Sequence, residues 1–197
     1  MNTPTHAIVN LSLLGKLPLS QFNLPIVIGG IIPDLPIFVF YFWAKFVRKL
    51  PESQIWSEAY YQPLCQNAVA LFHSIPLAVL GWIIGYYGGW QTMQILCLSL
   101  ILHSLLDLPV HNSDAHRHFF PFSNYRFISP LSYWDREHYG TIVALIELLL
   151  VIVATCNCFS FVQSALGKGL MIVVNLFYLT GYIYFYARSG PFKSGEY

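Results

Sequence analysis

A short stretch of this chain, residues 103–140, holds most of the side chains that can bind a metal ion or transfer a proton. It contains five of the seven histidines and three of the four aspartates, although only 10% of all residues are charged. His103 and Asp107 are four residues apart, so both side chains leave one face of a helix. An imidazole and a carboxylate on one face are half of a typical zinc site. The same pair can instead form a buried hydrogen bond that ties two helices together.

Further candidate ligands follow this pair closely. His111 comes eight residues after His103. Asp114, His116 and His118 alternate, so in an extended loop their side chains would leave on one side. Six candidate ligands within sixteen residues are more than a structural core requires. We favour His116 as a metal ligand and expect His118 to orient one of the ligands without binding the metal itself. The alternative is that one or both histidines belong to a solvated loop and have no metal-related role.

Three other candidate ligands are distant in sequence. His6 begins the first apolar segment and Asp34 ends the second, so a hairpin of the two would bring them to the same end. A carboxylate among the apolar neighbours of Asp34 needs a partner, for which His6, Arg126 or a metal are candidates. His73 begins an apolar span that we expect to pair with the span ending in His103. No GxSxG motif surrounds His73, which argues against a serine hydrolase.

Arg126, Asp135 and His138 are candidates for chemistry beside a metal. An arginine fork matches phosphate and carboxylate oxygens, so we expect Arg126 to clamp an anionic group unless it only lies at the membrane interface. Asp135 or His138 can act as a general base. Glu147 lies within an apolar segment and needs a partner there; it can orient a ligand histidine or pair with another group of the bundle.

The composition is that of an integral membrane protein. Hydrophobic residues make up 56% of the chain and the mean hydropathy is +0.55, whereas a soluble protein has about 25% charged residues. A net charge of +1 without a basic block argues against a nucleic-acid partner. The four cysteines form no CxxC pair, and the N-terminus lacks the basic region of a cleavable signal peptide. No linker divides the chain, so we expect residues 1–197 to form one domain.

The apolar segments predict an all-α, multi-pass bundle of four or five spans. A crossing within the first 45 residues stays open, and residues 111–140 should form a polar loop. Residues 1–19 predict a helix that is too short to cross a bilayer and ends at Gly15 and Pro18; we expect it at the membrane interface or under the bundle. The expected spans are 67–90, 91–110, 141–159 and 167–187.

Basic residues predict the orientation of the bundle. The side with the 111–140 loop carries nine of the ten Lys and Arg, including Arg188 and Lys193 of the C-terminal tail. In this count Lys16 is assigned to the side of the 111–140 loop, and Lys168 alone lies on the other side. The positive-inside rule then places this side, and the candidate site, in the cytoplasm.

Four motifs carry a resemblance to a known family: Thr5-His6, GGIIPD at 29–34, HSLLD at 103–107 and HFFPFS at 118–123. They resemble those of the membrane-bound metal-dependent hydrolases, also described as LexA-regulated or LexA-binding inner-membrane hydrolases. The resemblance extends through about residue 140. It implies a multi-pass protein of the bacterial inner membrane that uses a divalent metal for hydrolysis.

More distantly, the order of histidines and aspartates is similar to that of the zinc-dependent phospholipases C, all-α enzymes that cut phosphodiesters. Those enzymes continue with an HxxxE motif, whereas here no acid follows His138 before Glu147, so a third metal position is not implied. This similarity implies as ligands His6, Asp34, His73, His103, Asp107 and either His111 or His116.

Our leading hypothesis is a metal-dependent hydrolase that acts on a phosphoester or lipid-like substrate at the membrane surface, with membrane lipids as its surroundings. One or two divalent ions, zinc by their ligand types, would lower the pKa of bound water to near 7. The alternative is a non-enzymatic membrane protein whose His/Asp cluster binds or passes a metal ion, or only locks the helices together. The hydrolase requires an open pocket, whereas a purely structural network would be closed to solvent. In the hydrolase, the ligands would be His6, Asp34, His103, Asp107 and His116.

Overall fold

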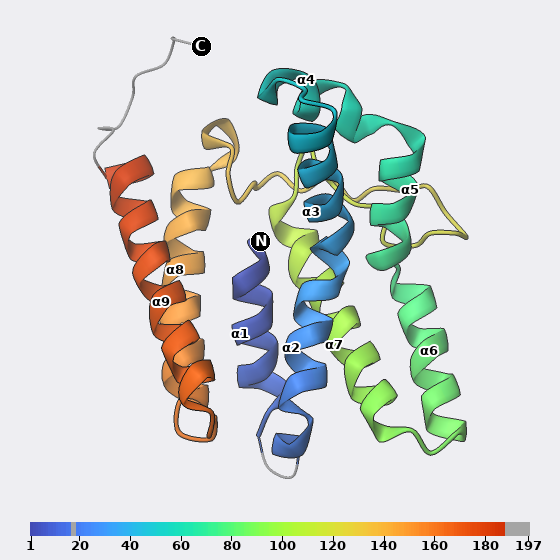
Figure 1. Cartoon of the computed structure of the whole chain (residues 1–197), viewed down its shortest axis with the longest axis vertical. Coiled ribbons are helices and arrows are strands. Elements are labelled where there is room, and N and C mark those ends of the chain that lie inside the picture. The colour runs from blue at the N-terminus through green and yellow to red at the C-terminus, as the bar shows by residue number, and fades with distance from the viewer. Residues whose placement is uncertain (17–18, 188–197) are drawn as a thin grey trace.

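The computed structural model describes residues 1–16 and 19–187, which form a helical bundle with no strand among them (Figure 1). The all-α fold predicted from sequence is therefore confirmed. Pro18, Arg188 and Lys193, which entered the predictions above, lie outside the described residues. The helices are α1 (Thr3–Leu14), α2 (Asn23–Ile31), α3 (Leu35–Phe42), α4 (Glu52–Ser57), α5 (Pro63–Phe72), α6 (Ile75–Tyr87), α7 (Gln91–Asp107), α8 (Gly140–Cys158) and α9 (Ala165–Tyr182).

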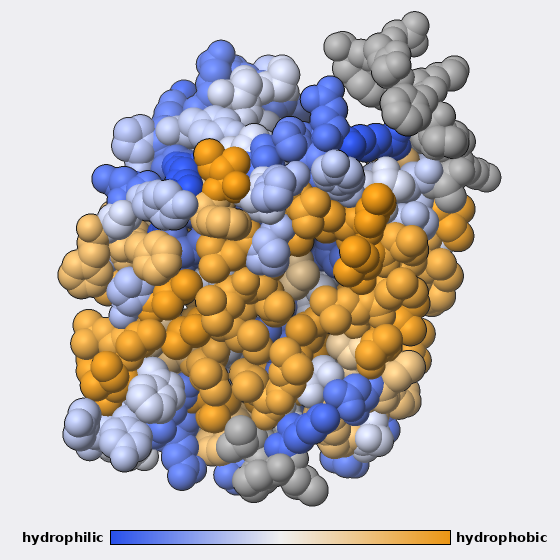
Figure 2. All heavy atoms as spheres, turned by 180° about the vertical axis from the view of Figure 1, so that it is seen from behind, coloured by the Kyte–Doolittle hydropathy of each residue, from blue (hydrophilic) through white to orange (hydrophobic). Residues whose placement is uncertain are grey.

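Four helical segments of the described chain are long and apolar enough to cross a membrane, and α5 with α6 makes a fifth if this bent pair is one span. The number agrees with the predicted four or five. The first of them lies where a crossing within the first 45 residues was left open, and it is long and apolar enough for one. Figure 2 shows a broad apolar band between more polar surfaces at the two ends, as a membrane-crossing bundle requires. The four segments are Asn23–Val47, Gln91–Val110, Gly140–Cys158 and Ala165–Tyr186.

The short helix α1 lies in the centre of the bundle, so the prediction of an interfacial position is wrong. It packs against α2, α7 and α8 (Figure 1), and residues 5–12 are all buried. Its polar side chains find partners inside: the Asn10 amide donates to the Ser99 hydroxyl at 2.8 Å, and the Asn157 amide donates to the Ser12 hydroxyl at 2.7 Å. These hydrogen bonds offset the cost of burying polar groups.

The span predicted at 67–90 is broken at His73. Helix α5 ends there, α6 begins at Ile75, and the two axes differ by 42°. Pro76 in the first turn of α6 has no backbone N–H to continue α5, and the Ser74 hydroxyl accepts from Leu77 N as an N-cap. The break places the His73 side chain inside the bundle, where it is fully buried.

Helices α2 and α3 continue each other through a 3-10 turn, η2 (Ile32–Asp34), which ends in the predicted ligand Asp34. Glycines let α2 approach its neighbours closely: a Cβ on Gly29 would come within 2.6 Å of Ser99 Cβ, and one on Gly30 within 2.8 Å of Ala7 Cα. Helices α1 and α2 therefore form the expected hairpin, with the start of α1 beside the end of α2.

The distribution of basic residues differs from the prediction at one position. Lys16 follows α1 and lies in the turn between α1 and α2, at the same end of the bundle as the turn between α8 and α9 that precedes Lys168 (Figure 1). Among the described residues, these two lysines are therefore opposite the end that carries the loop at 111–135. The remaining described Lys and Arg lie at the loop end, so the cytoplasmic orientation stays a prediction.

Candidate metal site

The predicted ligands converge inside the bundle although they come from five separate parts of the chain. His6 lies on α1, Asp34 on η2, His73 at the end of α5, and His103 with Asp107 on α7. His111 and His116 reach the same place from the following loop. Three overlapping groups have ligand atoms within 4.8 Å of one another: His6 with His103 and Asp107, Asp34 with His73 and His103, and His73 with Asp107 and His116. Together with His111, these residues are called the His/Asp cluster below.

Four residues of the cluster face one common point. His73 Nε2 lies 3.5 Å from Asp34 Oδ1 and 3.7 Å from Asp107 Oδ2. His103 Nε2 lies 3.7 Å from Asp34 Oδ1 and 3.1 Å from Asp107 Oδ2. All four side chains are buried or nearly so. Two imidazole nitrogens and two carboxylate oxygens therefore surround one small space.

The other nitrogen of each imidazole ring fixes its tautomer. His73 Nδ1 lies 2.9 Å from the carbonyl oxygen of Val69, and His103 Nδ1 lies 3.0 Å from that of Gly30. A carbonyl only accepts, so Nδ1 carries the proton in both rings and Nε2 presents a lone pair. Both Nε2 atoms are buried and make no hydrogen bond to the described residues. Carbonyl partners of this kind also orient metal-binding histidines in known sites.

Four separations are close to those expected around a tetrahedral ion. With metal–ligand bonds of about 2.0–2.1 Å, the edges of a regular tetrahedron are about 3.3–3.4 Å long. The four N···O separations are 3.1, 3.5, 3.7 and 3.7 Å. The lone pair of each Nε2 and the negative carboxylate oxygens repel one another unless a cation lies between them. His73 and His103 therefore each face the same two carboxylates, and a divalent cation would balance the charge of the two acids.

The second oxygen of Asp107 faces a further set of nitrogen atoms. Asp107 Oδ1 lies 2.9 Å from His6 Nε2 and 3.1 Å from His111 Nε2. The α-amino group of Met1 donates to the same oxygen at 2.6 Å and lies 2.9 Å from His111 Nε2. The His111 ring is oriented by Asp114, whose Oδ2 accepts from Nδ1 at 2.9 Å. Asp107 thus contacts His6, His111 and the α-amino group through one oxygen and faces His73 and His103 with the other.

His116 and His118 lie at the edge of the cluster. The His116 ring is 4.1 Å from the His73 ring and 4.7 Å from the His111 ring. Burial, followed by the neighbouring His73, lowers the pKa of His116 well below its usual value. Burial also lowers the pKa of His118 to about 4. Both rings are therefore neutral at pH 7, the state in which an imidazole can bind a metal; only His116 belongs to a group of candidate ligands.

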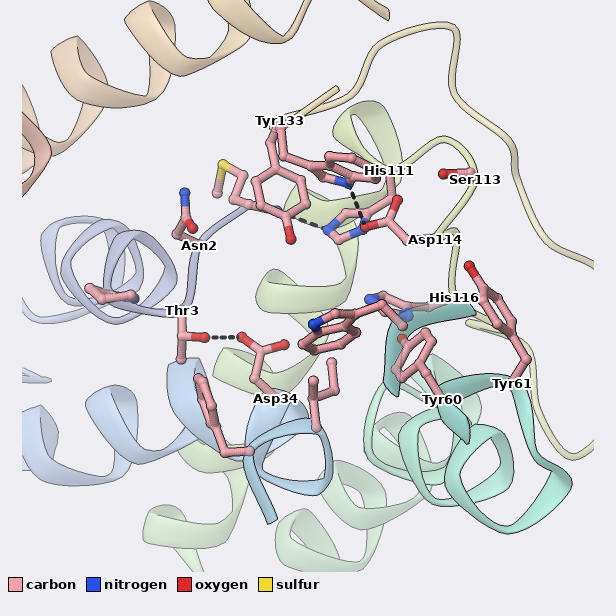
Figure 3. Close-up of a pocket in the computed structure, with 16 residues that line it drawn as sticks. Asn2, Thr3, Asp34, Tyr60, Tyr61, His111, Ser113, Asp114, His116 and Tyr133 are labelled. Carbon is pink, nitrogen blue, oxygen red and sulfur yellow. Dashed lines mark hydrogen bonds and ion pairs between the residues drawn. The ribbon is translucent and has the colours of Figure 1, made fainter. Parts of the chain in front are cut away.

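A cavity of about 770 Å³ gives access to the cluster, within the size range of small-molecule sites. Figure 3 shows Asp34, His111 and His116 in its wall, together with Thr3, whose hydroxyl donates to Asp34 Oδ2. Much of the remaining lining is aromatic. The cluster is therefore reached from an apolar pocket and is not closed off from it. The aromatic wall consists of Phe38, Trp56, Tyr60, Tyr61, Tyr133 and Trp134.

The three residues predicted to do chemistry beside the metal do not line this cavity. The Arg126 guanidinium donates to Ala115 O at 2.8 Å and to Gln66 Oε1 at 2.7 Å, so it ties the loop to α5. Asp135 accepts from His138 Nδ1 at 2.7 Å within the turn η6 (Arg136–His138). These three side chains make local contacts here, and their catalytic roles stay a prediction.

Sequence reasoning missed some contributors to the site and left one open. Glu147 on α8 holds the start of α1: its Oε1 accepts from Asn2 N at 2.8 Å and from the Thr5 hydroxyl at 2.6 Å. Asn2 and Thr5 are thus the partners that Glu147 needs within its apolar segment. Thr3 and Tyr133, in contrast, gave no sequence signal, because a lone threonine or tyrosine near a histidine is common.

Comparison of the chain with protein-family models, with curated proteins and with solved structures finds no match. The family resemblance therefore rests on the sequence motifs, and the activity that it implies is a proposal.

Proposed function

We propose that this protein is a membrane-bound, metal-dependent hydrolase that acts on a phosphoester or lipid-like substrate. The observation that carries the proposal is the convergence of two buried imidazole lone pairs and two carboxylate oxygens at separations of 3.1–3.7 Å. His73, His103, Asp34 and Asp107 would hold one divalent cation, and zinc suits this set of nitrogen and oxygen donors. The other oxygen of Asp107 accepts from the α-amino group of Met1, which also contacts His111.

The cavity supports an enzymatic function over a purely structural one. A structural polar network would satisfy its own donors and acceptors and would be closed to ligands. Here Asp34, His111 and His116 line an open cavity, and the Nε2 atoms of His73 and His103 have no hydrogen-bond partner in the described chain. Metal sites that retain access from a cavity are typical of catalysis.

The chemistry follows from the kind of group that the site would hold. A bound divalent ion polarises a phosphoryl oxygen and lowers the pKa of water. In the overall reaction the water oxygen forms a new bond to phosphorus, the P–O bond to the alcohol breaks, and the alcohol leaves with one proton of the water. The aromatic and apolar walls of the cavity suit a substrate with an apolar part.

Elemental analysis of the protein purified in detergent tests the metal site. We expect one or two equivalents of zinc in the wild type and none in a His103→Ala, Asp107→Ala double variant. His138→Ala is the matched control, because His138 lies outside the cavity and should leave the metal content unchanged. Absence of any divalent metal above background in the wild type would overturn the proposal.

Hydrolysis separates the enzyme from a non-enzymatic metal-binding protein. The metal-loaded wild type should release nitrophenol from bis(p-nitrophenyl) phosphate or cleave a phosphodiester lipid in mixed micelles, and the double variant should do neither. Stoichiometric metal without hydrolysis of either substrate would support the non-enzymatic alternative.

A further inference from the structure

We propose that a groove between α8 and α9 binds an acyl chain of a bilayer lipid, whose polar end then reaches the cavity at the His/Asp cluster. The inference rests on the proposed function and names its substrate class: a lipid that enters from the side, out of the membrane.

The groove is a separate hollow of about 260 Å³. Its walls are Ala144 and Glu147 of α8, and Phe177, Tyr178 and Gly181 of α9. Phe177 is 75% exposed, so the groove is open along its outer side. Both α8 and α9 are candidate membrane spans, so in a bilayer the outer side of the groove would face acyl chains.

The groove and the cavity share a wall. Asn2, Pro4, Tyr133 and Trp134 line both, so a chain in the groove would lie next to the cavity. The same wall carries the first turn of α1, from which His6 extends to the cluster. A lipid with one acyl chain in the groove and its polar end in the cavity would have its apolar part in the membrane. Its ester group would then lie near the candidate metal ligands.

Helix α9 is suited to form one side of such an entrance. Only 6% of its apolar window is buried within the protein, compared with 28–33% for the other three candidate spans, and it lies at the edge of the bundle (Figure 1). Gly181 contributes the space: a Cβ built on it would meet no atom within 4 Å. The polar end of the groove is made by Glu147 and Tyr178, which are engaged with Thr5 of α1.

Photocross-linking in proteoliposomes tests the groove directly. The vesicles consist of phosphatidylethanolamine and phosphatidylglycerol, with a small fraction of phosphatidylethanolamine that carries a diazirine on one acyl chain. Mass spectrometry of the wild type should find cross-links concentrated on Ala144, Phe177 and Gly181. Cross-links spread evenly along the outer face of α9 would overturn the inference, and this result needs no variant.

Two glycine variants on the same helix provide a matched comparison. Gly181→Phe fills the groove and should lower cross-linking of its residues by about tenfold, which corresponds to the loss of about two buried methylene groups. Gly169→Phe places the same side chain on α9 where a Cβ also meets no atom within 4 Å, outside the groove, and should leave cross-linking unchanged. Equal cross-linking in all three proteins would refute the groove.

Metal content distinguishes the two proposals. If wild-type protein binds metal but shows no preferred cross-linking in the groove, the lipid entrance is wrong and the metal site stands. If wild-type protein binds no metal, the proposed function is wrong, whichever residues are cross-linked.

Discussion

Replacement of Glu147 by glutamine should weaken both the fold and the metal site, because this carboxylate holds the start of α1 in place. Its two oxygens accept from the backbone N–H of Asn2, from the Asn2 side-chain amide and from the Thr5 hydroxyl, and only 3% of Glu147 is exposed. The same first turn of α1 contacts the ligands: Thr3 donates to Asp34, and His6 contacts Asp107.

The size of the effect follows from these contacts. A hydrogen bond to a charged group contributes ~1.5–3 kcal/mol, and a neutral one ~0.5–1.5 kcal/mol. Glutamine keeps one oxygen for Asn2 N and Thr5 but loses the charge, which costs about 1 kcal/mol for each bond. Its amide nitrogen also faces the Asn2 amide as a second donor. We therefore expect a loss of ~2–4 kcal/mol, or roughly 5–15 °C in the unfolding midpoint for a chain of this length.

Two measurements check this prediction. Thermal unfolding in detergent should show the lower midpoint, and zinc titration of the folded variant should show an affinity reduced by about 10–100-fold, as for other groups that orient metal ligands. Glu137→Gln is the control, because it makes the same chemical change at an exposed position of η6. A lower midpoint with unchanged zinc affinity would refute the claim that the start of α1 positions the ligands.

Other consequences of the structure can be measured with the same assays. Asp135→Asn should leave the bound metal and its affinity unchanged, because Asp135 pairs with His138 outside the cavity; a loss of metal in elemental analysis would contradict this. A chelator should lower the unfolding midpoint by roughly 5–10 °C, since a metal ion at about 100 times its Kd stabilises the folded protein by ~2.7 kcal/mol. An unchanged midpoint would show that no ion stabilises the fold. Gly30→Ala should reduce metal content by forcing α2 away from Ala7 of α1, whereas Gly169→Ala, with open space around its Cβ, should not; equal metal content in both would show that the close packing of α1 and α2 is unnecessary.

The ligands that could be predicted from the sequence are those whose positions follow from regular geometry. His103 and Asp107 share a helical face because they are four residues apart. His6 and Asp34 come together because two short apolar segments separated by a turn form a hairpin, whose free ends coincide. Neither inference needs knowledge of the tertiary packing beyond neighbouring helices.

The position of α1 could not be predicted, because its length gave the wrong indication. A helix of 12 residues cannot cross a bilayer, and its polar residues are typical of an interface. Inside the bundle the same residues are satisfied by side chains that come from distant helices: Asn10 by Ser99 and Ser12 by Asn157. Such pairs involve single polar residues in otherwise apolar segments, and nothing in either segment indicates which residue it will meet.

The contacts of the loop residues could not be predicted for a different reason. In a helix or strand the spacing fixes the side-chain direction, but the described loop at 111–135 has no period. Arg126 is close in sequence to the ligands His111 and His116, yet its guanidinium contacts Gln66 and Ala115. Proximity in sequence therefore indicated the region of the site but not the contacts of Arg126.

The charge balance of the cluster joins these observations. Asp34 and Asp107 are two carboxylates among side chains that are largely removed from water, and burying such charges without compensation is costly. Arg126, the basic side chain that the sequence offered to Asp34, is bound elsewhere. The α-amino group of Met1 contacts one oxygen of Asp107 and leaves the other facing the histidines.

Protons on the histidines would be the other way to supply positive charge. However, the Nδ1 protons of His73 and His103 are directed at backbone carbonyls, and the two Nε2 atoms make no hydrogen bond to a carboxylate within the described residues. An imidazolium would be expected to direct its Nε2–H at a carboxylate oxygen with hydrogen-bond geometry. The proposed divalent cation would supply positive charge and accept both lone pairs, and it would thereby account for the ring tautomers and the burial of two acids.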